Sequence, residues 1–116
     1  MVELPRIDLF RDENGKFNRV KEDGAFYGYA MYSVDDKRVA KVLYRTKSKN
    51  VGNPHFRNSE QAIEELEQEL RQDSVINHDG KNFRPSGIYS VQLGLGPFNA
   101  ESDIRDIPAL VMEQVE

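Results

Sequence analysis

The fold is decided by residues 25–47, which read AFYGYAMYSVDDKRVAKVLYRTK. Aromatic and β-branched residues such as those of this stretch favour a pleated, half-buried strand. The pair Asp35-Asp36 interrupts them, and aspartate favours turns because its side chain bonds to the nearby backbone. The stretch therefore predicts a β-hairpin, with one strand over 25–34 and the returning strand over 37–47.

A two-residue turn at 35 and 36 would place Val34 opposite Lys37 and Tyr32 opposite Val39. Side chains alternate between the two faces of a strand, so this pairing predicts two distinct faces. The face expected to join the core carries Tyr27, Tyr29, Met31, Ala40, Val42 and Tyr44. The opposite face is expected to be a mixed surface of Phe26, Ala30, Tyr32, Val39, Lys41, Leu43, Arg45 and Lys47. A one-residue bulge would exchange the assignments beyond it.

The clearest helix signal is residues 58–73, which read NSEQAIEELEQELRQD. Ile63, Leu66 and Leu70 recur at the spacing of one helix face. Asn58 is expected to be the N-cap, since its side chain can accept a bond from a free backbone N–H. The apolar stripe is narrow, so the helix is expected to lie on a sheet rather than inside a bundle.

The remaining elements are expected from turn signals and alternation. Asn14-Gly15 predicts a hairpin over 7–20, and Asp79-Gly80 predicts a second turn. Pro85 to Gly87 is expected to break the chain before an alternating strand over 87–95. The tail, 102–116, fits either a short helix or an edge strand.

Together these elements predict a single α+β domain over 1–116, an antiparallel sheet of hairpins plus a later strand, with one principal amphipathic helix packed on one face. The chain has 116 residues, the size of one domain, and no Cys, which excludes disulfides and thiolate chemistry. The first ten residues lack the basic start and apolar run of a signal peptide. No apolar run is long enough to span a membrane, so a soluble, cytoplasmic protein is expected.

Residues suited to catalysis are few. His55 and His78 could act as general acid and base on a phosphodiester, with Lys47 or Lys49 holding phosphate. Solvated loop histidines are the favoured interpretation, which leaves a metal-independent phosphodiesterase as the weakest alternative. His78 and Asp79 lack the spaced partners of a metal site, and no G-x-G-x-x-G motif is complete. We therefore expect no enzyme, no catalytic residue, no cofactor and no metal.

The distribution of charge is the most informative functional signal. Residues 37–57 hold seven Lys or Arg and no acid, although the net charge is -4. Residues 60–73 hold six acids and only one Arg. The basic segment has three interpretations: a surface that binds a partner, protection of a sheet edge, or a counterweight to the acidic helix.

The function favoured by these patterns is a small binding module, of the adaptor or inhibitor type, that docks a protein partner. Two surfaces could supply the contacts, separately or together: the basic and aromatic face of the hairpin and the acidic face of the helix. The expected contact residues are Phe26, Tyr32, Lys41, Leu43, Arg45, Lys47 and Lys49. The alternative is single-stranded DNA or RNA on the same hairpin, which the negative net charge disfavours. The opposite charge poles also suggest a homo-oligomer.

Overall fold

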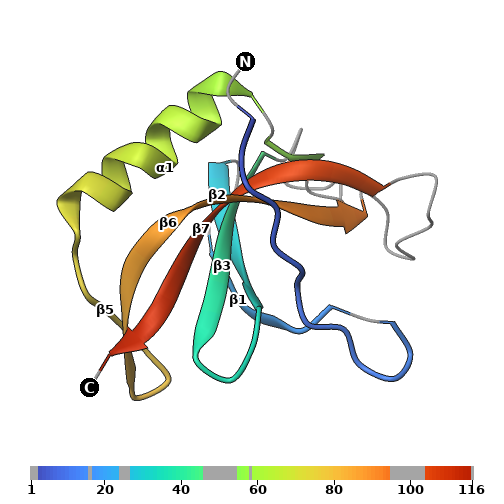
Figure 1. The fold of residues 1–116 in the computed structure, drawn as a ribbon, viewed down its shortest axis with the longest axis horizontal. Helices are drawn as coiled ribbons and strands as arrows, with labels where there is room; N and C mark the ends of the chain where they lie inside the picture. The colour runs from blue at the N-terminus through green and yellow to red at the C-terminus, as the bar shows by residue number, and fades with distance from the viewer. Residues whose placement is uncertain are drawn as a thin grey trace.

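The computed structural model describes residues 3–15, 17–23, 27–45, 55–57, 59–94 and 104–115. Its elements are β1 (Arg19–Asp23), β2 (Tyr27–Ser33), β3 (Arg38–Arg45), β4 (His55–Phe56), α1 (Glu60–Gln72), β5 (Ile76–His78), β6 (Lys81–Gly94) and β7 (Ile104–Val115). The strands form a curled antiparallel sheet in the order β1-β2-β3-β7-β6-β5, with β4 paired to β3 outside this path (Figure 1). The predicted α+β fold with a helix packed on the sheet is confirmed.

The β2–β3 hairpin forms where the sequence predicts it, but its register differs by one residue. Ser33 pairs with Val39, and Tyr32 pairs with Ala40. The predicted pairing of Tyr32 with Val39 is therefore wrong. A shift of one residue turns every side chain of one strand to the other face relative to its partner. Tyr32 consequently lies on the face opposite to Lys41.

The register shift comes from the turn, which has three residues between its closing pair instead of two. The Val34 amide donates to the Arg38 carbonyl over 3.0 Å. Inside the turn, the Asp35 carboxylate accepts the Lys37 amide at 3.0 Å and the Arg38 guanidinium at 2.7 Å. These bonds from Arg38 and Lys37 lower the pKa of Asp35 below its ordinary value. The carboxylate is therefore ionised at neutral pH and holds the wider turn.

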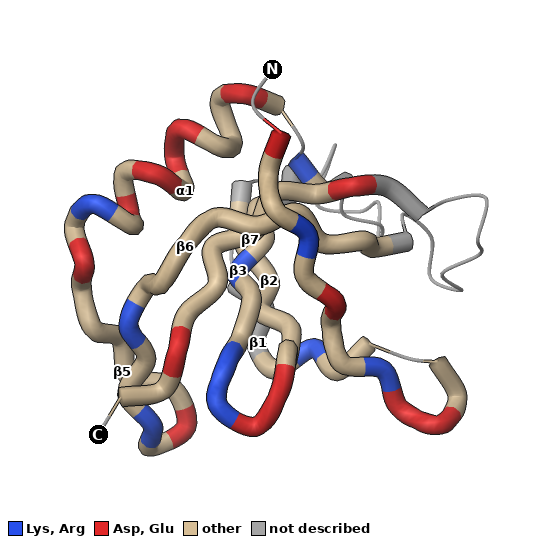
Figure 2. The backbone as a smooth tube through the Cα atoms, viewed as in Figure 1, with Lys and Arg blue, Asp and Glu red and all other residues tan. Residues whose placement is uncertain are grey.

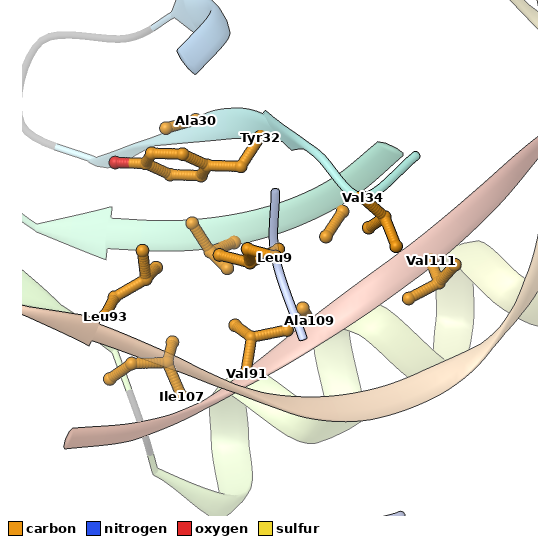
Figure 3. Packing of buried hydrophobic residues seen from close by; sticks show 11 residues of the cluster. Leu9, Ala30, Tyr32, Val34, Val91, Leu93, Ile107, Ala109 and Val111 are labelled. Atoms are coloured by element: carbon orange, nitrogen blue, oxygen red, sulfur yellow. The ribbon is translucent and has the colours of Figure 1, made fainter. Parts of the chain in front are cut away.

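Two buried clusters lie on the two faces of the sheet. The inner core is formed by Leu9, Ala30, Tyr32, Val34, Ala40, Val42, Val91, Leu93, Ile107, Ala109 and Val111. The helix-side core is formed by Met31, Val39, Leu66, Phe83, Leu110 and Met112. Figure 3 shows Leu9 between the side chains of β2 and those of β6 and β7. The N-terminal segment therefore covers the face that the helix leaves open.

The predicted N-terminal hairpin is reduced to its turn. The Gly15 amide donates to the Asp12 carbonyl over 2.9 Å, and Gly15 has a φ of 77°. In the described residues, the two sides of this turn are joined by one isolated antiparallel bridge, between Arg11 and Phe17. The preceding segment instead bonds to β6, where the Ile7 amide donates to the Ser90 carbonyl over 3.0 Å. Covering the inner core with apolar side chains thus prevails over local pairing.

Of the two structures predicted for the tail, a short helix or an edge strand, the strand is the one that forms. This strand lies inside the sheet and not at its edge. β7 lies between β3 and β6, and residues 107–112 are all buried. A strand covered on both faces carries a continuous apolar run rather than an alternation. Residues 107–112, which read IPALVM, form such a continuous apolar run. Because the run has no period of two or of 3.6, its pattern does not distinguish a helix from a strand.

The β5–β6 hairpin confirms the predicted turn at Asp79-Gly80. Both residues have positive φ, 53° for Asp79 and 77° for Gly80, which suits a two-residue hairpin turn. The predicted break at Pro85 to Gly87 is wrong. β6 continues through it with a register shift between Pro85 and Gly87, so these residues form a bulge within one long strand.

The helix begins one residue later than predicted. The N-cap is Ser59, whose hydroxyl accepts the Ala62 amide at 3.2 Å, so the predicted cap at Asn58 is wrong. Of the predicted stripe, Leu66 is buried and Ile63 and Leu70 are half-buried; Ala62 beside them is buried, and α1 contacts β6 and β7. Asp73 ends the helix in the left-handed conformation with a φ of 49°. In the part of the chain that the structure describes, no helix has the length and apolar character needed to cross a membrane.

Candidate interaction surfaces

Among the described side chains of the predicted contact set, Tyr32 does not share a face with Lys41 and Leu43. Tyr32 belongs to the inner core and is 4% exposed, whereas Leu43 packs against the helix-side core. Lys41 shares the face of Leu43 and has a side chain that is 16% exposed. Arg45 is described only through its backbone, which pairs with His55. Three further predicted contact residues lie outside the described residues: Phe26, Lys47 and Lys49.

The surroundings of Tyr32 are those of a core residue. Its ring meets Phe17 edge-on with the centroids 6.2 Å apart, and Phe56 with the centroids 6.3 Å apart. The hydroxyl accepts bonds from Nε of Arg19 at 3.2 Å and from Nη2 of Arg19 at 2.9 Å. The ring and the hydroxyl are therefore both satisfied within the domain, as a buried tyrosine requires.

Two cations of the basic segment, residues 37–57, form ion pairs with acids of α1. Nζ of Lys41 lies 2.5 Å from Oε1 of Glu69 and 4.4 Å from the centre of the Tyr29 ring. Arg57 forms an ion pair with Glu65. Because β3 lies between β2 and β7, the interpretation of this strand as edge protection is wrong. Lys41 and Arg57 instead support the third interpretation, that the basic segment balances the protein's own helix, whereas Arg38 pairs with Asp35.

The Lys41–Glu69 contact is expected to stabilise the fold. A double-mutant cycle of Lys41→Met and Glu69→Gln, followed by urea denaturation, is expected to give a coupling energy of about 1–2 kcal/mol. Methionine keeps an unbranched apolar side chain and removes the ammonium group that contacts both Glu69 and the Tyr29 ring. The exposed pair of Arg71 and Glu67, at 3.7 Å, is the matched control and is expected to give about 0.3–0.5 kcal/mol. Additive effects at Lys41 and Glu69 would contradict this role.

The outer face of α1, formed by Glu60, Glu64, Glu67, Gln68 and Arg71, is turned away from the sheet. Figure 2 shows the acidic positions that follow one another along the helix. Glu67 lies 3.7 Å from Arg71, but no described cation pairs with Glu60 or Glu64. One helical turn separates Glu60 from Glu64, about 6 Å along the axis. Within the described residues, Glu60 and Glu64 thus present negative charge to the solvent without a paired cation.

A second surface feature is a groove of about 580 Å³ at the end of the sheet where two turns meet. We call it the turn-end groove. It is lined by Asn18, Val20, Ser33, Asp35, Asp36, Arg38, Val39, His78, Asp79, Lys81 and Phe83. Its side chains come from β1, β2, β3, β5 and β6, and from the β2–β3 and β5–β6 turns. Figure 2 shows charges of both signs on these two turns.

The two histidines are not brought together. His78 lines the turn-end groove beside the first residues of β3, whereas His55 pairs with Arg45 at the last residue of β3. Seven residues of extended strand separate these ends, about 24 Å. The acid–base pair is therefore not assembled. Among the described residues, no group of three His, Asp or Glu side chains is placed to hold a metal ion.

Sequence reasoning identified the opposite charges of the two segments but missed the groove. The groove depends on bringing the turn at 35–37 beside the turn at 79–80, which no local pattern indicates. Comparison of the chain with protein-family models, with curated proteins and with solved structures found no match.

Proposed function

We propose that the protein is a small cytoplasmic binding domain, without catalytic activity, that docks a basic surface of a protein partner on the outer face of α1. One observation carries this proposal. Two acids of α1 are paired with cations of the basic segment, Glu69 with Lys41 and Glu65 with Arg57, whereas Glu60 and Glu64 have no described cation beside them. An adaptor and an inhibitor would both use such a face.

The hairpin receives less support as the docking surface. To expose the Tyr32 ring, the domain would have to open its inner core, because Tyr32 is packed against Phe17 and Phe56. Burial of an aromatic side chain contributes about 2–3 kcal/mol, which such an opening would forfeit. The outer face of α1 requires no rearrangement, since the helix is already ordered by its packing on the sheet.

The nucleic-acid alternative also receives less support. Three cations of the basic segment, Arg38, Lys41 and Arg57, are paired with carboxylates of the domain. A cation that already neutralises a carboxylate contributes little to the phosphate contacts on which nucleic-acid binding depends. The same pairing weakens the suggestion of a homo-oligomer, because Lys41 and Arg57 already pair with acids of α1 within one chain.

The proposal is tested by photo-crosslinking from the outer face of α1. A photoreactive amino acid at Gln68 is introduced into the wild type and into Glu60→Gln/Glu64→Gln/Glu67→Gln, and both are irradiated in a lysate of the native cells. The control, Glu3→Gln/Asp8→Asn/Glu13→Gln, changes the net charge equally at exposed positions of the N-terminal region. Protein adducts are expected to fall at least tenfold in the helix variant and to persist in the control.

Two results would overturn the proposal. The first is equal loss of adducts in the helix variant and the control, which would show a response to net charge alone. The second is tight, salt-sensitive binding of labelled random single-stranded DNA or RNA in an anisotropy titration, which would favour the nucleic-acid alternative. Circular dichroism of each variant verifies that α1 is retained.

A further inference from the structure

We propose that the turn-end groove binds a lysine or arginine side chain of an extended peptide segment. This site is separate from the outer face of α1 and does not depend on it. The groove's volume of about 580 Å³ is within the ordinary range of ligand sites and exceeds that of one long side chain. The choice of ligand follows from its floor, its rim and the sheet edge beside it.

The floor of the groove is apolar. Val39 is 6% exposed and Phe83 is 5% exposed, and both belong to the helix-side core, with the half-buried Val20 packed against them. The stem of a lysine or arginine is a chain of methylene groups that covers apolar surface while its charged head stays in polar surroundings. The floor therefore fits the stem of such a side chain.

The rim of the groove supplies carboxylates for the charged head. Asp36 and Asp79 are exposed, and neither forms an ion pair with a described residue. Asp35 differs, because it already accepts bonds from Arg38 and Lys37. Asp79 is held in a tight turn with a φ of 53°. A cation between Asp36 and Asp79 would receive charge-assisted hydrogen bonds, which are shorter and stronger than neutral ones.

The remaining charges of the groove favour a cation over an anion. Its cations are Arg38, which is paired with Asp35, and Lys81, which forms no ion pair with a described residue. His78 is half-buried and is the one other titratable group that lines the groove. Asp35 and Arg38 cancel each other, which leaves two carboxylates, Asp36 and Asp79, facing one lysine. An anion would therefore meet more like charge than opposite charge.

The edge of the sheet argues for a peptide rather than a free amine. β1 is a terminal strand of the sheet, and no described strand pairs with its outer edge. Asn18, which precedes β1, and Val20, the second residue of β1, line the groove. An extended segment can add to such an edge through backbone hydrogen bonds, while every second side chain points to one face. One such side chain would enter the groove.

The two histidines of the chain make a sharp test, because one lines the groove and the other lies at the opposite end of β3. We would titrate the protein at fixed pH with the acetylated and amidated peptides Ala-Lys-Ala, Ala-Arg-Ala, Ala-Gln-Ala and Ala-Glu-Ala, and follow both imidazole ring signals by NMR. The Lys and Arg peptides are expected to shift the His78 signal saturably and to leave the His55 signal unchanged.

Two variants with the same change in net charge distinguish the groove from bulk electrostatics. Asp36→Asn/Asp79→Asn is expected to weaken the peptides at least tenfold, and asparagine tolerates the positive φ of position 79. Glu3→Gln/Glu13→Gln, at exposed positions that do not line the groove, is expected to bind the peptides as the wild type does. Equal weakening in both variants, a shift of His78 by the Glu peptide, or no saturable shift with the Lys and Arg peptides would overturn the proposal.

Discussion

Replacing Tyr32 with alanine is expected to lower the free energy of unfolding by about 3–5 kcal/mol, the cost of removing a large buried aromatic side chain. The ring fills the inner core between Phe17 and Phe56, and only 4% of the residue is exposed. The cavity cannot be filled by local movement alone, because β2 is held between β1 and β3. Urea denaturation of the wild type and of Tyr32→Ala measures the difference.

Tyr32→Phe is the control that separates the ring from the hydroxyl. Phenylalanine keeps both edge-on ring contacts and removes the bonds from Arg19, so a loss of about 1 kcal/mol is expected. The opposite pattern is a stable Tyr32→Ala variant that loses partner binding. It would show that Tyr32 is an exposed docking residue, as the two-residue turn predicted, and that the register of the hairpin is wrong.

The hairpin shows why its pairing could not be predicted from the sequence. Alternation reports register only where one face is apolar and the other is polar. In β2, Ala30 and Tyr32 face the inner core while Met31 faces the helix-side core, so both faces are apolar. The bonds that Asp35 makes to Lys37 and Arg38 decided the turn length, and both turn lengths were compatible with the sequence.

Elements with strong local signals were predictable. The helix has a cap, an apolar stripe and 13 residues, and its predicted position is correct to within two residues. The Asp79-Gly80 turn needs positive φ at two positions and has the residues that supply it. β7 lacks such a signal, because an interior strand covered on both faces has no period of two.

The surfaces depend on contacts between distant segments, and these were predictable only in part. Opposite charge in residues 37–57 and 60–73 indicated that the two segments could balance each other. The choice of Glu69 as the partner of Lys41 depends on how α1 crosses the sheet, which residue types do not specify. The turn-end groove likewise requires turns about 40 positions apart to meet, and no spacing rule relates their sequences.

Replacing Leu66 with alanine is expected to lower the free energy of unfolding by about 3–5 kcal/mol, since the side chain is completely buried between α1 and the sheet. Isolated helices of this length are marginal in water, so α1 depends on this packing to persist. Urea denaturation followed by far-ultraviolet circular dichroism measures the loss. Leu70→Ala, at a half-buried position of the same stripe, is expected to cost about half as much.

The outcome for Leu66 also bears on the outer face of α1, because the ordered spacing of Glu60 and Glu64 exists only while the helix is docked. If Leu66→Ala loses less than about 1 kcal/mol, α1 does not depend on the helix-side core, and a preformed acidic face is no longer a sound basis for docking. If the loss is large and partner capture by the folded Leu70→Ala variant stays intact, the sheet acts as the support and the outer carboxylates act as the contact. The side of α1 that faces the sheet would then determine stability, and the outer face with Glu60 and Glu64 would determine partner binding.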